Sequence, residues 1–109
     1  FVRVKADVLD RFIRDNGRRP IRVGDVVSYS GIGRRALEIR FQKALNRSIR
    51  DQIQRTHLER VNRLLAETEL PLEKVAELSG FNSLSYLSNV FRRETGMTLA
   101  QYRRHTRPV

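Results

Sequence analysis

The chain has 109 residues, enough for one compact domain, and its 22 Lys and Arg against 12 Asp and Glu give a formal charge of +10. It has no cysteine and only two distant histidines, which excludes a disulfide framework, a thiolate zinc site, a histidine metal cluster and a cysteine nucleophile. No apolar run approaches the roughly 20 residues of a membrane span. These counts leave a basic domain with a polyanionic partner, and we expect no metal and no cofactor.

Helical spacing of apolar residues marks the first part of the chain. Residues 4–15 place one apolar face inward, formed by Val4, Val8, Leu9, Phe12 and Ile13. A short helix is predicted over 23–29, a glycine-containing turn over 30–33, and a longer helix over 34–45.

The second part continues the helical pattern. Ser48 is a candidate N-cap for the longest predicted helix, over 49–67. Further helices are predicted over 72–79 and 84–95, and Thr98 caps a last short one. No segment alternates with a period of two, so we predict an all-α fold of about seven helices and no sheet.

The chain contains an internal repeat. At an offset of 49, the matched residues are Val23, Val26, Ser30, Gly31 and Ile32 with Leu72, Val75, Ser79, Gly80 and Phe81. After the turn the offset is 50, and the matched residues are Gly33, Leu37, Phe41, Asn46 and Ser48 with Ser83, Leu87, Phe91, Gly96 and Thr98. The repeat divides the single domain into subdomains over 1–48 and 68–109, joined by a connector helix over 49–67.

The repeated unit is typical of a helix-turn-helix, whose second helix enters the DNA major groove. An ordinary αα-hairpin is the alternative for either copy, and two copies in a basic chain favour DNA. The 19-residue connector would be roughly 28 Å long, close to the spacing of about 34 Å between successive major grooves. One chain can then place two recognition helices, over 34–45 and 84–95, in adjacent grooves.

The run ELSGFNSLSYLSNVFRRETGMT, followed by Tyr102-Arg103, closely resembles the second helix-turn-helix of the AraC/XylS family of bacterial transcription regulators. The resemblance extends from about Val8 to Arg104. In the first subdomain, Arg34-Arg35-x-Leu37-Glu38-x-Arg40-Phe41 looks like the sugar-responsive branch that contains the xylose-operon activators. The resemblance implies an upstream domain that binds a small effector, a sugar in that branch, and activation through contact with RNA polymerase. Because the chain begins with Phe1, we expect it to be part of a longer protein whose effector-binding domain is not included in this chain.

The candidate base contacts lie on the exposed faces of the two recognition helices. The family's usual base-contacting positions correspond to Arg35, Glu38 and Ile39. Arg34 is a further candidate because it is expected to be exposed in the first turn of the same helix. Arginine can bond guanine, isoleucine can contact a thymine methyl, and Glu38 can accept from cytosine or instead form a helix ion pair with an arginine. In the second helix the outward candidates are Leu84, Ser85, Ser88 and Asn89. Local capping by Ser85 and incidental exposure of Leu84 are the alternatives there.

Phosphate contacts are expected from basic residues and from helix N-termini. The candidates are Arg40, Lys43, Arg47, Ser48, Arg92, Arg93 and Thr98. Residues 1–50 carry 13 cations and 5 anions, and residues 51–109 carry 9 and 7, so the first subdomain is expected to be the stronger electrostatic anchor. His57 is interpreted as a packing residue of the connector rather than a ligand or pH switch. His105 lies in a basic tail, RRHTRP, that we expect to be frayed.

The sequence therefore predicts sequence-specific binding to a double-stranded operator or promoter, inside the cytoplasm at the bacterial nucleoid. The alternative is a nonspecific nucleic-acid or RNA-binding module. It is disfavoured because the aromatic residues singled out all fall on predicted core faces, namely Phe12, Phe41, Phe81, Phe91 and Tyr102. An enzyme is not expected, since no catalytic arrangement of side chains occurs at usable spacing.

Overall fold

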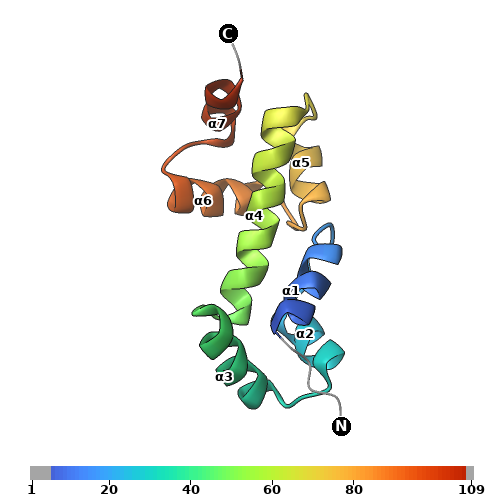
Figure 1. Cartoon of the computed structure of the whole chain (residues 1–109). Helices are drawn as coiled ribbons and strands as arrows, with labels where there is room; N and C mark the ends of the chain where they lie inside the picture. Colours follow the sequence, from blue (N-terminus) through green and yellow to red (C-terminus); the bar gives the residue numbers. More distant parts are fainter. Residues whose placement is uncertain (1–5, 108–109) are drawn as a thin grey trace. The chain divides into compact units, whose positions relative to one another are not determined.

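The computed structural model describes residues 6–107, and these residues form seven helices and no strand. The helices are α1 (Ala6–Asp15), α2 (Val23–Ser30), α3 (Arg34–Leu45), α4 (Ile49–Glu67), α5 (Leu72–Leu78), α6 (Leu84–Thr95) and α7 (Leu99–Thr106) (Figure 1). The predicted all-α class is confirmed. The bounds of α3, α4 and α6 are those predicted. Val4, predicted to begin the first apolar face, lies outside the described residues.

The chain forms two compact units. Within the described residues, unit 1 comprises 6–17 and Ile21–Thr56, and unit 2 comprises Arg18–Pro20 and 57–107. Helix α4 is continuous in sequence and contributes its first eight residues to unit 1 and the rest to unit 2.

Unit 1 packs α1, α2, α3 and the start of α4 around one apolar core. The buried residues of this core are Leu9, Ile13, Ile21, Val26, Leu37, Phe41, Ile49 and Ile53. Val8 was expected on the same buried face, but its side chain is 41% exposed. Successive residues of a helix are about 100° apart around its axis. Val8 therefore lies to one side of Leu9, at the edge of the face that contacts α2 and α3.

Unit 2 has its own core, at the end of α4 and across α5, α6 and α7. Its buried residues are Val61, Leu65, Val75, Ala76, Phe81, Leu87, Phe91 and Leu99. Four positions of this core repeat those of unit 1 at the offsets read from the sequence. The matched pairs are Val26 and Val75, Leu37 and Leu87, Phe41 and Phe91, and Ile49 and Leu99.

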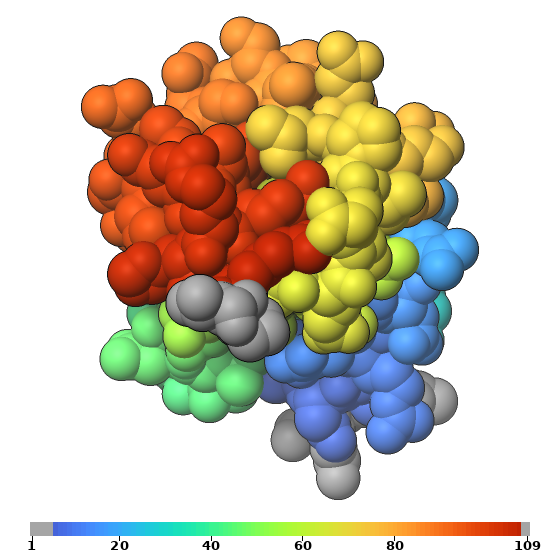
Figure 2. Space-filling model, turned by 90° about the horizontal axis from the view of Figure 1, so that it is seen from above, coloured from blue at the N-terminus to red at the C-terminus, as the bar shows by residue number. Residues whose placement is uncertain are grey.

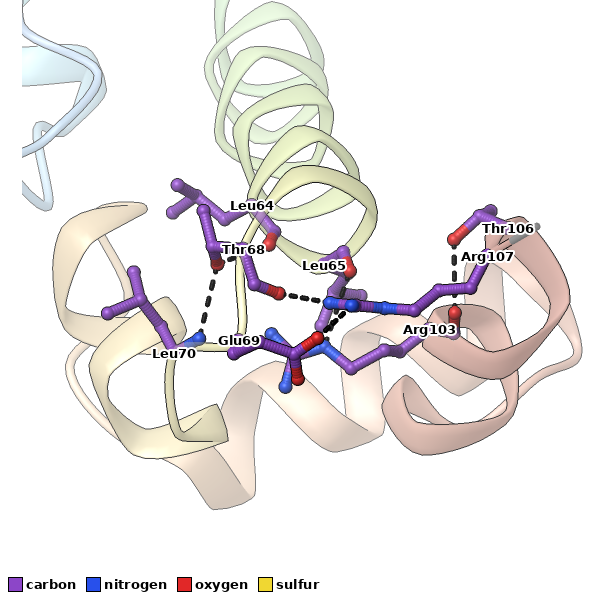
Figure 3. A network of polar contacts seen from close by, with 8 residues as sticks. All are labelled: Leu64, Leu65, Thr68, Glu69, Leu70, Arg103, Thr106 and Arg107. Atoms are coloured by element: carbon purple, nitrogen blue, oxygen red, sulfur yellow. Dashed lines mark hydrogen bonds and ion pairs between the residues drawn. The ribbon is translucent and has the colours of Figure 1, made fainter. Parts of the chain in front are cut away.

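The C-terminal helix is anchored by two arginines, so the expectation of a frayed basic tail is wrong for residues 103–107. Arg103 donates through Nε to the Leu65 carbonyl at 3.3 Å. Arg107 donates to the Thr68 carbonyl and pairs with Glu69 (Figure 3). The red C-terminal segment accordingly lies against the yellow end of α4 (Figure 2). Both cations satisfy carbonyls at a helix C-terminus, where the helix dipole favours positive charge.

Candidate nucleic-acid interface

The turn of unit 1 is fixed by a buried serine and a glycine. The Ser30 hydroxyl donates to the Val27 carbonyl at 2.8 Å and accepts from the Ile32 amide at 3.0 Å. Gly31 ends α2 with φ of +70°, a conformation that non-glycine residues avoid. Gly33 is the N-cap of α3. These contacts set where α3 begins relative to the core of unit 1.

Helix α3 presents one face to the core and a charged face to solvent. Leu37 and Phe41 are each 1% exposed. The exposed face carries every candidate predicted on this helix, namely Arg34, Arg35, Glu38, Ile39, Arg40 and Lys43. Ile39 is 49% exposed, so an apolar side chain stands among charges where it can meet a thymine methyl.

Glu38 forms the helix ion pair that was the alternative to a base contact. Its Oε1 lies 3.6 Å from Nε of Arg34, and both side chains are exposed. An exposed pair of this spacing contributes only about 0.3–0.5 kcal/mol to stability. Arg35 has no part in that pair, so it remains the first helix's candidate for bidentate contact with guanine.

The residues after α3 form a second set of candidate DNA contacts. Arg47 is half-buried and donates through Nη1 to Oε1 of Gln52 at 2.9 Å. Ser48 caps α4, since its hydroxyl accepts from the Asp51 amide at 3.0 Å. The predicted N-cap is confirmed, while phosphate contact by Arg47 and Ser48 stays a prediction.

The turn of unit 2 has a matched glycine in a crowded place. Gly80 has φ of +82°, and a Cβ there would lie 2.5 Å from Nε2 of His57 and 2.6 Å from the Arg19 carbonyl oxygen. The buried hydroxyl of Ser79, which matches Ser30, has no hydrogen-bond partner within residues 6–107. The two turns therefore share a sequence pattern and differ in what surrounds it.

His57 packs inside unit 2, as the sequence analysis expected. It is 5% exposed, Nε2 donates to the Arg19 carbonyl at 3.0 Å, and the ring meets Phe81 edge-on at 5.7 Å. Burial lowers the pKa of His57 below its ordinary value of 6.5, and the hydrogen bond to the Arg19 carbonyl opposes that shift. The ring joins the segment Arg18–Pro20 to the turn at Gly80.

Helix α6 presents a neutral face beside its core face. Ser83 is the N-cap, and its hydroxyl accepts from the Tyr86 amide at 3.1 Å. Ser85 and Asn89 are exposed, and Ser88 is half-buried. The cap is therefore Ser83 and not Ser85, which leaves Ser85 available to DNA.

Leu84 was expected to face outward, but the structure places it half-buried against the core of unit 2. On a helix, position 84 lies one turn from Leu87 and Ser88, so it stands at the border of the buried face. Only part of its surface is available for a thymine methyl, and its base contact stays a prediction.

Tyr86 was not predicted as a site residue, yet its side chain is 50% exposed on α6. Its ring lies 6.1 Å from that of Phe81 in a tilted arrangement. Tyr86 lies about 100° around the helix from Leu87, at the border of the core face, where the sequence carries no local signal for exposure. Tyr86 adds a phenol hydroxyl and an aromatic edge to the exposed surface of α6.

The candidate phosphate contacts of unit 2 lie at the C-terminal end of α6 and at the N-terminus of α7. Arg92 and Arg93 are exposed, and Arg93 lies 3.7 Å from Glu94. At α7, Thr98 forms a capping box with Gln101: the Thr98 amide donates to Oε1 of Gln101 at 2.9 Å, and the Thr98 hydroxyl accepts from the Gln101 amide at 3.1 Å. Because the Thr98 amide is used internally, a phosphate there would meet the amides that follow it.

The electrostatic contrast predicted between the two subdomains is clearest at the recognition helices. Within the described residues, unit 1 and unit 2 each carry 10 Lys and Arg and 6 Asp and Glu. The recognition helices still differ, because α3 holds four cations and one acid while α6 holds two cations and one acid. Arg3 and Lys5 lie outside the described residues and add two further cations to the first subdomain, so its stronger charge stays a prediction, while the contrast between the two recognition helices is evident.

Within residues 6–107, no group of three or more His, Asp or Glu side chains is placed to hold a metal ion. No helix in this range combines the length and apolarity needed to cross a membrane.

The sequence pattern of a helix-turn-helix domain family matches residues 26–105 of the chain. The xylose operon regulatory protein of Haemophilus influenzae is 30% identical over 92 residues, which is 84% of this chain and 24% of that protein. The structure of the xylose-binding transcription activator xylR superposes with a TM-score of 0.82 at 27% identity, covering 99% of this chain and 29% of that one. The DNA-binding domain of AdpA, solved with a target DNA, gives a TM-score of 0.86 at 21% identity, covering 92% and 90%.

These matches define the class as a helix-turn-helix regulator domain, in agreement with the repeat and with the exposed faces of α3 and α6. The chain belongs to the AraC-type helix-turn-helix family of DNA-binding domains. The relatives that match the chain are named as transcription regulators and not as enzymes, in line with the expectation that this domain is not an enzyme. The chain spans about a quarter of the length of the xylose operon regulatory proteins that it matches.

Proposed function

We propose that this chain binds double-stranded DNA in a sequence-specific manner, with α3 and α6 in adjacent major grooves. The observation that carries the proposal is that each unit holds its recognition helix by a buried leucine and phenylalanine at matched positions, Leu37 with Phe41 and Leu87 with Phe91. The opposite faces of both helices are largely exposed and mostly polar. A helix held in this way can offer its outer face to base edges while its inner face keeps its place.

The similarity to AdpA, whose DNA-binding domain was solved with a target DNA, supports this use of the fold. The chemistry of the two faces predicts a site of unlike halves. Arginines on α3 suit guanine, whereas Asn89 on α6 suits adenine and its neighbouring serines adapt to several bases.

Selection of a binding site from random duplex DNA tests the proposal. The chain is expected to enrich one asymmetric site and to bind it on the order of 10³-fold or more tightly than a scrambled duplex of the same composition. Equal affinities for the selected and scrambled duplexes across a range of salt concentrations would refute it, because counterion release alone gives binding without sequence preference.

For the longer protein we propose a bacterial transcription activator that acts in the cytoplasm, at the nucleoid. The names of the relatives, xylose operon regulatory protein and xylose-binding transcription activator, favour a sugar as the effector of its remaining part. RNA polymerase is the proposed partner at the promoter. Transcription from the selected site by RNA polymerase, measured with the longer protein in the presence and absence of pentose sugars, tests activation and the sugar effector. Transcription that does not depend on the sugar would refute the effector proposal.

The nonspecific or RNA-binding alternative would need an exposed platform of aromatic rings, and residues 6–107 provide none. Phe41, Phe81 and Phe91 are buried, and Phe12 and Tyr102 are half-buried. Tyr29 and Tyr86 are exposed, but they lie on separate units. Competition with single-stranded RNA distinguishes the alternatives, since a charge-driven module would be displaced by RNA as readily as by duplex DNA.

A further inference from the structure

A chain of polar side chains crosses unit 1 from α1 to the loop after α3. Nη1 of Arg47 donates to Oε1 of Gln52 at 2.9 Å, and Nε2 of Gln52 donates to Oδ1 of Asp10 at 2.7 Å. The other oxygen of Asp10 accepts from Nε of Arg14 at 3.0 Å. Arg47, a candidate phosphate contact, is thus tied through one buried amide to a carboxylate on a different helix.

The Gln52 amide is locked in one orientation. Its side chain is 5% exposed, and both of its polar atoms have partners. Arginine can only donate and an ionised carboxylate can only accept, so the amide oxygen must face Arg47 and the amide nitrogen must face Asp10. In a flipped amide, the Gln52 nitrogen would face the donor Arg47 and the Gln52 oxygen would face the acceptor Asp10, so neither hydrogen bond could form.

The fold of the repeat does not need this polar pair. At the offset of 50, the positions of Arg47 and Gln52 are occupied in unit 2 by Met97 and Tyr102, and both of these pack against the core of unit 2. Apolar packing therefore suffices at these two positions to complete a unit. In unit 1, the same positions hold an arginine at the surface and an amide that fixes it.

We propose that Gln52 is a positioning residue that holds Arg47 ready for a DNA phosphate, and that Asp10 orients the Gln52 amide. The inference rests on the proposed DNA-binding function. Arg47 uses one N–H for Gln52, and the remaining N–H groups of its five-donor guanidinium can bind a phosphate. Fixing this long side chain before binding removes part of the entropy that it would otherwise lose on the DNA.

Three variants of the chain test the inference on the selected duplex, with affinity measured across salt concentrations. Arg47→Ala should lower affinity and reduce the slope of log affinity against log salt by about 0.9, the loss of one phosphate contact. Gln52→Leu should lower affinity by about two- to tenfold and leave the slope unchanged, because the charge of Arg47 still reaches the phosphate. The double variant should bind like Arg47→Ala alone.

A matched pair of acidic residues on α1 supplies the control. Asp10→Ala and Asp7→Ala remove the same charge from the same helix, and Asp7 is exposed and lies outside the polar chain. Asp10→Ala should bind the duplex more weakly than Asp7→Ala, because only Asp10 orients Gln52. Should Gln52→Leu unfold in a thermal melt, this pair carries the test by itself.

Each other outcome overturns the inference. If the loss of affinity in the double variant equals the product of the losses in the two single variants, Gln52 acts independently of Arg47. If Gln52→Leu and Asp10→Ala bind as tightly as the unmodified chain and Asp7→Ala, no positioning occurs. If Arg47→Ala changes neither affinity nor slope while the unmodified chain still prefers the selected duplex, Arg47 touches no phosphate and the proposed function stands. If the unmodified chain shows no preference, the proposed function itself fails.

Discussion

Units 1 and 2 bury matched cores and surround them with different chemistry. Leu37 and Phe41 in one unit occupy the places of Leu87 and Phe91 in the other. Outside these cores, α3 is charged where α6 is neutral, and the polar pair Arg47 and Gln52 stands where unit 2 has an apolar pair. The core therefore defines a helix-turn-helix unit, while the exposed helix faces and the flanking loops define what each unit does.

The two turn glycines should give the largest contrast. We expect Gly31→Ala to lower the free energy of unfolding by about 1 kcal/mol, the cost of a left-handed backbone with a Cβ. Gly80→Ala should cost roughly 3 kcal/mol, because its Cβ also meets the His57 ring and the Arg19 backbone carbonyl. Denaturant unfolding of the two variants measures the difference. Equal losses would show that the contact among His57, Arg19 and Gly80 imposes no constraint.

The exposed faces should differ in the half-site that each variant affects. Arg35→Ala is expected to relax base preference in one half of the selected site by about 1–3 kcal/mol, and Asn89→Ala in the other half by a similar amount. Neither should change the salt dependence by a full phosphate contact. Site selection repeated with each variant measures the effect. Loss of preference in the same half by both variants would contradict separate recognition by α3 and α6.

The phosphate contacts should make α3 and its loop the stronger anchor. Arg47 is pre-positioned by Gln52, whereas Arg92 is exposed at the end of the less basic helix α6. Arg47→Ala should therefore flatten the salt dependence of DNA binding by about one contact, and Arg92→Ala by less. Titrations of the two variants on one duplex compare them. Equal flattening would remove the electrostatic contrast between the recognition helices.

The smallest effect concerns the pH dependence of unit 2. In the unfolded chain His57 has its ordinary pKa of 6.5, whereas in the folded chain burial lowers the pKa of His57 below that value. At a pH between the folded and the unfolded pKa of His57, the unfolded state binds more protons than the folded state. The free energy of unfolding should therefore fall as pH drops below about 6.5. His57→Gln, which cannot titrate in this range, should lose that part of the pH dependence. An unchanged pH profile would show that His57 is not held neutral.

The sequence predicted local structure well because its signals are local. The bounds of α3 and α6 follow from their caps, Gly33 and Ser83, and from the left-handed residues Asn46 and Gly96 that end them. The buried leucine and phenylalanine of each recognition helix followed from periodicity. Their exposed faces could then be predicted by exclusion.

What the sequence did not predict depends on residues far apart in the chain. Arg103 meets a carbonyl 38 residues earlier, so no local pattern announces that the basic tail is anchored. Gln52 is buried because Asp10, 42 residues earlier, satisfies its amide. The half-burial of Leu84 and the exposure of Tyr86 concern residues at the border of a helix face, where a periodicity of 3.6 residues leaves the environment to the neighbouring helices.

The most direct test of the account compares four duplexes: the selected site, the site with either half scrambled, and the site with both halves scrambled. The unmodified chain should lose at least about tenfold in affinity for each half that is scrambled, because one mismatched base pair alone costs about 1–3 kcal/mol. The two losses should combine when both halves are scrambled. Affinities that are the same for all four duplexes at every salt concentration would contradict recognition of DNA sequence by either helix.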